Sequence, residues 1–287
     1  MTTPTAVRGE LGALARELLG SERFAAFVAK PGAVRVSEPL LPAFLAAFWR
    51  AREVDDAEES GLVVVVPEDG DARDLAEAVS WYIGDEQVGV LTSRGVRRDS
   101  GLLPPVHLVG ERARALHVAE QGGLVCASAI GFAEGVAARD ERAERVELSV
   151  GDETPVDLLV ELLVEAGYEH VERVEERGQL AVRGGLIDVY PSTGREPVRV
   201  DMLGDEIESL RAFSPYTQRT IRPLEHVTIF PASERRTNVA RASSELEDDG
   251  AAREETELVP PFAFGDLVWE LDAVLAAIEE EALDAPD

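Results

Sequence analysis

Three short runs in which apolar and polar positions alternate stand close together in the second half of the chain. These runs cover residues 178–191, 197–202 and 207–213. Alternation with a period of two, bounded by glycine and proline, is typical of short antiparallel strands. Gly204-Asp205 suits a tight turn between two of them. The pair Gly184-Gly185 interrupts the first run, and we expect a bulge or kink there with Arg183 at its irregular point. The pattern predicts a small antiparallel meander.

The first half of the chain alternates helical and strand-like patterns instead. Apolar residues recur at helical spacing in residues 10–30, 40–50, 71–82 and 112–118. Strand-like runs occupy residues 34–36, 62–66, 88–91, 106–109 and 124–127. The consecutive aliphatic residues at 62–66 are typical of a strand that is buried on both faces. Strands that alternate with helices predict a parallel α/β sheet.

The pattern changes at residue 146. A turn at 150–152 precedes a helix that starts at Pro155 or Asp157 and ends at Gly167, a common helix terminator. The meander follows to about Pro231. Residues 233–257 are charge-rich and predict a loop, and residues 264–283 form an acidic amphipathic segment suited to a last helix or a strand–helix pair.

Composition narrows the classes of function. The formal net charge is −28, and an anionic surface of this kind repels phosphate backbones, so we expect no independent nucleic-acid binding. The single cysteine, Cys126, excludes an internal disulfide and suits a reducing compartment. The first ten residues lack a signal-peptide pattern, and no apolar run approaches the ~20 residues of a membrane-spanning helix. We therefore expect a soluble cytoplasmic protein without a membrane partner.

Nucleotide hydrolysis by an α/β domain needs a glycine-rich loop that ends in Lys-Ser or Lys-Thr, because backbone amides and the lysine hold the phosphates. We expect such a loop after the first strand, at residues 36–39, which contain neither glycine nor lysine. Lys30 is the only lysine of the chain, and Pro31 follows it. A standard phosphate-binding loop is therefore excluded, and we expect no cofactor.

Other catalytic or metal sites have weak support. The four histidines are scattered, and Cys126 has no cysteine partner, so a zinc site is not expected. Cys126 lies in an aliphatic run, where a small buried side chain is a better interpretation than a nucleophile. The acidic pair Asp205-Glu206 is more typical of a solvated turn than of a catalytic dyad.

Residues 146–222 resemble the UvrB-interaction domain that is shared by the bacterial transcription-repair coupling factor and the excision-nuclease helicase UvrB. The matching residues are Ala166-Gly167-Tyr168, residues 171–174, residues 178–191, residues 197–201, residues 204–211 and Gln218-Arg219-Thr220. The amino-acid sequence of these segments, for example from Arg183 to Pro191, is closer to that of the coupling factor than to that of UvrB. Residues 30–145 resemble the degenerate α/β domain that precedes this module in the coupling factor.

The resemblance implies a particular arrangement of domains. Residues 1–145 would form the first part of a degenerate P-loop-type parallel α/β domain. Residues 146–228 would form a small α+β interaction domain, with the antiparallel meander, inserted into the first. Residues 229–287 would return to the first domain and end in an acidic tail. The resemblance leaves open whether the chain is part of a longer coupling factor or a stand-alone relative.

The resemblance also implies a partner, the damage-sensing ATPase subunit UvrA of nucleotide excision repair. In UvrB, arginines of this module contact acidic residues of UvrA, and Arg183 matches one of them. Ala181 and His170 stand where UvrB has two other arginines. Arg173 and Arg177 are candidates to compensate for that loss. Guanidinium groups pair with carboxylates in a fork geometry, and the loss of a buried one typically costs ~2–5 kcal/mol.

Two alternatives remain open from the residues themselves. Arg183 could serve the sheet alone, through a salt bridge to Asp188, Asp201 or Glu206. The chain could also be a small-ligand-binding or enzymatic α/β protein that uses a crevice at the strand ends near residues 67–70. With the resemblance, we favour a non-catalytic interaction module of transcription-coupled repair.

Overall fold

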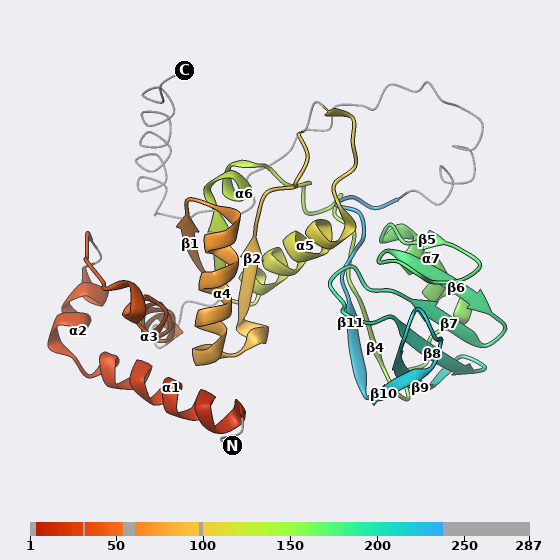
Figure 1. Cartoon of the computed structure of the whole chain (residues 1–287), viewed down its shortest axis with the longest axis horizontal. Coiled ribbons are helices and arrows are strands. Elements are labelled where there is room, and N and C mark those ends of the chain that lie inside the picture. The colour runs from red at the N-terminus through yellow and green to blue at the C-terminus, as the bar shows by residue number, and fades with distance from the viewer. Residues whose placement is uncertain (1–3, 31, 54–60, 98–99, 238–287) are drawn as a thin grey trace.

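The computed structural model describes residues 4–30, 32–53, 61–97 and 100–237, and Figure 1 shows an α/β unit beside a smaller, strand-rich unit. The helices and strands of the first unit are α1 (Pro4–Leu19), α2 (Glu22–Ala29), η1 (Glu38–Leu40), α3 (Leu41–Glu53), β1 (Leu62–Val66), α4 (Asp69–Ile83), η2 (Asp85–Gln87), β2 (Val88–Leu91), α5 (Val106–Glu120), β3 (Leu124–Ser128) and α6 (Ala129–Ala133). The described strands of this unit form a parallel sheet in the order β1-β3-β2. The α/β class predicted from the sequence is confirmed.

Helices cover both faces of this sheet. Leu124 and Cys126 of β3 pack with Ala76 and Val79 of α4 and with Trp49 of α3 on one face. On the opposite face the alternate residues of β3 pack against α5. The central strand β3 is thus buried on both sides, as expected of a parallel sheet with helical covers. None of the described helices has both the length and the apolar character needed to cross a membrane.

Three predictions about strands in this unit need correction. Residues 34–36 form no strand in the structure. Residues 106–109 are the first turn of α5, not a strand, because a short apolar run cannot distinguish a strand from a buried helix segment. Residues 62–66 do form β1, but β1 is an edge strand of the described sheet and Val65 is 36% exposed, so burial on both faces belongs to β3 instead.

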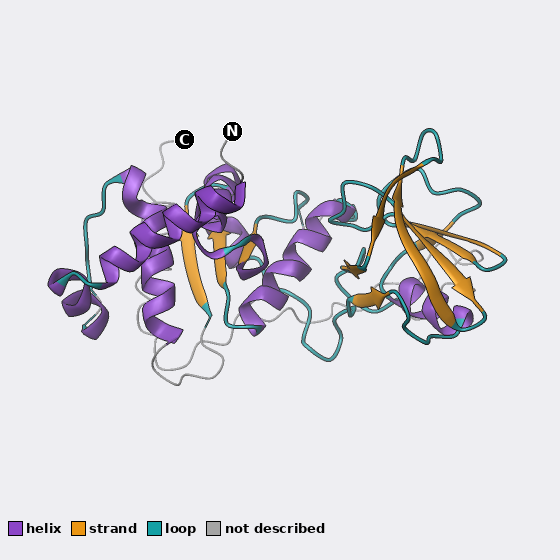
Figure 2. Cartoon of the chain, turned by 90° about the horizontal axis from the view of Figure 1, so that it is seen from below, coloured by secondary structure: helices purple, strands orange, loops and turns teal. Residues whose placement is uncertain are grey.

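The second unit contains one helix and two sheets (Figure 2). Its elements are β4 (Val146–Ser149), α7 (Val156–Glu165), β5 (Glu169–His170), β6 (Gln179–Arg183), β7 (Leu186–Val189), β8 (Val198–Leu203), β9 (Glu206–Phe213), β10 (Thr220–Leu224) and β11 (His226–Ile229). Strands β4 and β11 pair with each other, and the larger sheet has the order β10-β9-β8-β7-β6-β5. All its pairings are antiparallel except that of β5 with β6. The predicted meander is therefore confirmed.

Two glycine turns set the register of the meander. Gly184-Gly185 is the loop of a tight hairpin, since Arg183 pairs with Leu186 across it. Gly184 has a φ of 60°, and a positive φ at the first central position is typical of a type II′ turn. The prediction of a bulge at this point was wrong, because the glycines connect two strands and do not interrupt one. Gly204-Asp205 is the tight turn that the sequence predicts, between β8 and β9.

One face of the large sheet is the core of the second unit. Leu159 and Leu163 of α7 pack there against Leu180, Ile187 and Val200 of the strands. The strands alternate, so their other face carries Asp188, Arg199, Asp201, Arg211 and Phe213 in place of aliphatic side chains. This second face is where the charged residues of the meander meet.

Helix α5 lies between the two units (Figure 2) and packs closely against the second. A Cβ atom added at Gly110 of α5 would lie 2.2 Å from Oγ of Ser192. Beyond β11, Glu234 returns to the α/β unit and pairs with Arg94 and with Arg112 of α5, whose Nε lies 3.3 Å from Glu234 Oε1. These contacts fix the second unit on the first at two separate points.

Candidate partner interface

Arg183 stands at the end of β6, beside the hairpin turn, and its side chain is exposed. Its guanidinium group donates a hydrogen bond to the backbone carbonyl oxygen of Glu172. Among the residues that the structure describes, no carboxylate lies within ion-pair distance of Arg183. The alternative of a salt bridge to Asp188, Asp201 or Glu206 is therefore wrong.

The nearby carboxylates are paired with other arginines. Asp188 accepts two hydrogen bonds from Arg199, one from Nε at 2.6 Å and one from Nη2 at 2.7 Å. Asp201 pairs with Arg211 and accepts a hydrogen bond from Ser209. Because these partners come from adjacent strands of the same face, they stabilise the sheet, and no carboxylate of the described residues compensates the charge of Arg183.

The Asp188–Arg199 pair is the most buried of these contacts. The side chain of Asp188 is 8% exposed and that of Arg199 19%. The hydrogen bonds to Asp188 raise the pKa of Arg199, although burial opposes the shift. The guanidinium of Arg199 also lies over the ring of Phe213, 4.6 Å from the ring centre. This pair is a fixed structural element of the sheet, not a free charge.

His170 and Ala181, the other two positions matched to arginines of UvrB, differ in exposure. His170 lies in β5 with an exposed side chain. Ala181 shares the face of Arg183 on β6, but its side chain is only 2% exposed. The structure thus places Ala181 out of reach of a partner, whereas His170 can be contacted.

Arg173 and Arg177 lie on the connection between β5 and β6 and point in different directions. Nη2 of Arg173 donates to the carbonyl oxygens of Pro215 at 3.2 Å and Tyr216 at 3.3 Å. Nε of Arg177 donates to the carbonyl oxygen of Gly194 at 2.8 Å. Only Arg173 is joined to the neighbourhood of Arg183, since the residue before it, Glu172, accepts the hydrogen bond of Arg183.

The connection itself is held by a residue that the sequence did not single out. The side-chain oxygen of Gln179 accepts hydrogen bonds from the backbone amides of Glu175 and Glu176, at 2.9 and 3.0 Å. Val174 is 1% exposed, so its side chain fixes the middle of the segment. A polar residue at the first position of a strand is the only sequence signal for this role, and it is common.

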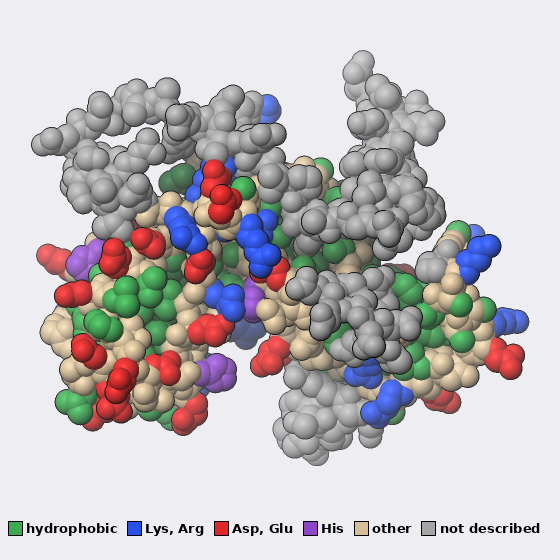
Figure 3. Space-filling view, turned by 180° about the vertical axis from the view of Figure 1, so that it is seen from behind, with side chains coloured by type: hydrophobic (Ala, Val, Ile, Leu, Met, Phe, Trp, Pro, Cys, Tyr) green, Lys and Arg blue, Asp and Glu red, His purple; other side chains and the backbone are tan. Residues whose placement is uncertain are grey.

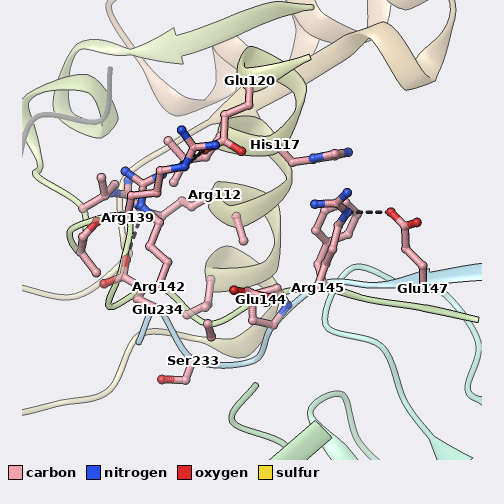
Figure 4. A pocket seen from close by; sticks show the side chains of 18 residues that line it. Arg112, His117, Glu120, Arg139, Arg142, Glu144, Arg145, Glu147, Ser233 and Glu234 are labelled. Atoms are coloured by element: carbon pink, nitrogen blue, oxygen red, sulfur yellow. Dashed lines mark hydrogen bonds and ion pairs between the residues drawn. The ribbon is translucent and has the colours of Figure 1, made fainter. Parts of the chain in front are cut away.

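A cleft of about 470 Å³ lies at the junction of the two units (Figure 4). Its lining includes Arg142 and Arg145, and Figure 3 shows positive side chains gathered over the middle of the molecule. Arg145 pairs with Glu147 at 2.7 Å, and Arg142 lies 3.5 Å from Glu120. His117 also lines the cleft, and burial lowers its pKa. This cleft is at a different place from the crevice predicted near residues 67–70.

The loop after β1 carries a carboxylate at the start of α4. Asp69 accepts hydrogen bonds from the backbone amide of Ser93 at 3.0 Å and from its hydroxyl at 2.6 Å. Burial raises the pKa of Asp69, but hydrogen bonds from Ser128 and Ser93 outweigh it and lower the pKa. The first strand is β1, so the expected position of a phosphate loop is here and not at residues 36–39. A fixed negative charge at this helix N-terminus disfavours phosphate.

Cys126 has the surroundings of a structural side chain. It is fully buried in β3, and burial raises the pKa of its thiol to about 12. A nucleophilic cysteine needs a lowered pKa and access to solvent. In the described part of the chain, no group of three His, Cys, Asp or Glu side chains is arranged to hold a metal ion.

Comparison with known proteins finds a family model that matches the second unit. Residues 146–234 match the model described as the UvrB interaction domain. The chain is 36% identical over 182 residues to the transcription-repair-coupling factor of Mycobacterium tuberculosis. This alignment covers 60% of this chain and 15% of that protein. The coupling factor of Escherichia coli is 43% identical over 84 residues, covering 29% of this chain and 7% of that one.

The chain also matches a second group of relatives. The UvrABC system protein B of Mycobacterium tuberculosis is 31% identical over 176 residues, covering 60% of this chain and 24% of that protein. The chain thus spans about 15% of the length of the coupling factors it matches over 182 residues and about a quarter of the UvrABC system protein B.

Proposed function

We propose, from the premise that residues 146–234 are a UvrB interaction domain, that this chain is a non-catalytic interaction module of nucleotide excision repair that docks on UvrA. The premise makes protein–protein recognition the function of the second unit. Its similarity to both coupling factors and UvrABC system protein B suggests a partner that both kinds of protein use. The domain bounds that we propose are 1–145 and 229–287 for a degenerate P-loop-type α/β domain and 146–228 for the interaction domain.

The single observation that supports this function most is the state of Arg183. Its side chain is exposed, and its guanidinium is held by a backbone carbonyl instead of a carboxylate. Asp188 and Asp201 are each paired with another arginine. An acidic group of a partner would therefore meet a positive charge that is already oriented and that no carboxylate of the described residues neutralises, which favours charge-assisted, bidentate pairing.

We propose further that the chain itself does not hydrolyse ATP. The only lysine is Lys30, and Asp69 occupies the turn after β1 where a phosphate-binding loop would need backbone amides and a lysine. Purified chain is expected to release no phosphate from ATP above a buffer blank, in the presence or absence of DNA. A sustained ATP hydrolysis activity that co-purifies with the chain would contradict this part of the proposal.

A pull-down with immobilised UvrA tests the docking. The wild-type chain is expected to bind saturably, and Arg183→Glu to lose binding by a factor of ten or more, because the substitution places like charges opposite each other. Arg139→Glu is the matched control, since Arg139 is 84% exposed on its side chain and lies in the first unit. Equal losses in both variants, or no binding by the wild type, would overturn the proposal.

A further inference from the structure

The loop that joins β9 to β10, residues 214–219, presents an unusually exposed aromatic side chain. Tyr216 is 89% exposed, more than any other large hydrophobic side chain for which the described residues give a value. The loop around it is well ordered by its own hydrogen bonds. The amide of Ser214 donates to the carbonyl of Arg219 at 3.0 Å, and the amide of Gln218 donates to the carbonyl of Ser214 at 2.8 Å.

The loop contains a strained backbone position. Gln218 has a φ of 60°, and it is the only non-glycine residue with a positive φ in the part of the chain that the structure describes. Such a conformation is unfavourable for a side chain of this size and persists only where the surroundings enforce it. Strained positions of this kind concentrate at functional sites, and hydrogen bonds of its side chain hold Gln218 in place.

Side chains from the sheet hold the loop from beneath. The amide nitrogen of the Gln218 side chain donates to the carbonyl of Pro215 at 2.9 Å, and its oxygen accepts from Nη2 of Arg199 at 3.3 Å. Arg199 is fixed in turn by its bidentate pair with Asp188. A chain of hydrogen bonds thus runs from the buried pair of Asp188 and Arg199 to Gln218 in the loop.

A second support comes from the β5–β6 connection. Arg173 donates to the carbonyl oxygens of Pro215 and Tyr216. This contact puts a guanidinium against the backbone of Tyr216. The same connection accepts the hydrogen bond of Arg183 at Glu172. The loop, Arg173 and Arg183 are therefore linked through one continuous segment.

We propose that residues 214–219 form a preformed recognition loop, in which Tyr216 is a contact residue for the partner that Arg183 binds. The inference rests on the proposed function and adds a named residue to that surface. A single exposed aromatic residue is ordinary. The loop that carries Tyr216 is different, because two arginines and a glutamine already hold it in a strained conformation, so contact with a partner costs little further loss of backbone freedom.

The chemistry of the loop defines the surface that it fits. Tyrosine and arginine are the residues that most often dominate binding energy at interfaces, where an aromatic ring enters a dry pocket. Arg183 is linked to this loop through Glu172 and Arg173, and its guanidinium favours carboxylates around such a pocket, whereas Arg173 already lies 3.6 Å from Glu175. The partner surface that we infer is an apolar depression bordered by acidic side chains.

Substitutions of Tyr216 in the whole chain, measured by titration against UvrA, test the inference. Tyr216→Ala is expected to weaken binding about 10- to 100-fold, the effect typical of a central aromatic contact. Tyr216→Phe keeps the ring and should stay within about twofold of wild type. Leu158→Ala is the control, because Leu158 is 46% exposed on α7, which covers the opposite face of the sheet, and it should bind as wild type does.

The outcomes separate the inference from the proposed function. If Arg183→Glu loses binding while Tyr216→Ala retains it, the loop inference is overturned and the proposed function stands. If the wild-type chain does not bind UvrA at all, the proposed function fails and the inference with it. Weak binding by Tyr216→Ala at unchanged thermal stability supports both.

A double-substitution cycle separates the roles of Arg173 and Tyr216. If Arg173 positions the loop, Arg173→Ala weakens binding in the wild-type background but has little further effect in the Tyr216→Ala background. Additive losses would instead mean that Arg173 contacts the partner by itself, and would overturn its positioning role. The free energy of unfolding of each variant, measured in urea, checks that the sheet remains intact.

Discussion

At the scale of single residues, two positions that correspond to arginines of UvrB differ in whether a partner can reach them. His170 and Ala181 both stand where UvrB has arginine, but His170 is exposed and Ala181 is buried. Strand pairing, not local sequence, separates the two positions, because Ala181 lies opposite Asp188 on the neighbouring strand, and Asp188 is bound by Arg199. A motif alone therefore cannot say which of the two positions a partner can reach.

This difference leads to a prediction for the two positions. His170→Arg restores a guanidinium at an exposed site and is expected to tighten UvrA binding about three- to tenfold, without loss of stability. Ala181→Arg forces a long charged side chain into a closed site and is expected to destabilise the fold by about 1–3 kcal/mol or more. Binding titrations and urea unfolding measure the two effects. Tighter binding by Ala181→Arg with unchanged stability would contradict the burial described here.

The carboxylates of the meander show what residue-level reasoning can and cannot supply. The alternation of Arg199 and Asp201 with valines and a methionine predicts that both lie on one face of a strand, and they do. Which arginine each carboxylate binds depends on strand order, which sequence spacing does not reveal. That is why Arg183 could be assigned to a salt bridge from the sequence, although Arg199 and Arg211 occupy its supposed partners.

At the scale of elements, turn chemistry was the most informative signal. Gly204-Asp205 predicted its hairpin correctly, and the alternating runs predicted β6 to β9. The error at Gly184-Gly185 came from treating two adjacent strands as one bent strand. The apolar run at 106–109 was misassigned because its residues suit either a strand or the buried first turn of α5. Tertiary packing of α5, against β2 and β3 and against the second unit, is not visible in the local sequence.

Helix α5 provides the test of this packing. Gly110→Ala places a Cβ atom 2.2 Å from Oγ of Ser192, which is itself fixed by a hydrogen bond to the carbonyl of Phe230 at 2.9 Å. We expect a loss of about 1–3 kcal/mol in the free energy of unfolding, since neither side can move freely. Thermal or urea unfolding measures it.

Gly70→Ala is the matched control for this substitution. Gly70 is exposed in the first turn of α4, and a Cβ atom there meets nothing within 4 Å. Replacement should leave stability unchanged or raise it by up to ~1 kcal/mol, as expected for alanine in a helix. If the two variants have the same stability, the close contact of α5 with the second unit is wrong.

At the scale of the whole molecule, the net charge of −28 stands against the arginine-based recognition surface that we propose. Long-range repulsion from an acidic partner would slow association at low salt, and at 0.1 M salt screens this repulsion at separations beyond about 10 Å. The pairing that we propose at Arg183 is therefore expected to act at short range. This balance makes local geometry more important for binding than overall charge.

The arrangement of the two units also belongs to this scale. Glu234 pairs with Arg94 and Arg112, and α5 packs against residues beside Ser192, so the interaction surface has a fixed orientation on the α/β unit. Composition and periodicity predicted both units but not their contact, because the contact depends on single residues far apart in the chain. The buried Arg112, 1% exposed, had no signal in the sequence beyond its place in a helix.

Calorimetric titration of UvrA with the purified chain and with Arg183→Glu tests the central claim most directly. A catalytically silent adaptor that offers an oriented, unneutralised guanidinium should give one saturable binding event, weakened at least tenfold by the substitution at equal thermal stability. A wild-type chain that produces no saturable heat, or an Arg183→Glu variant with unchanged affinity, would contradict it.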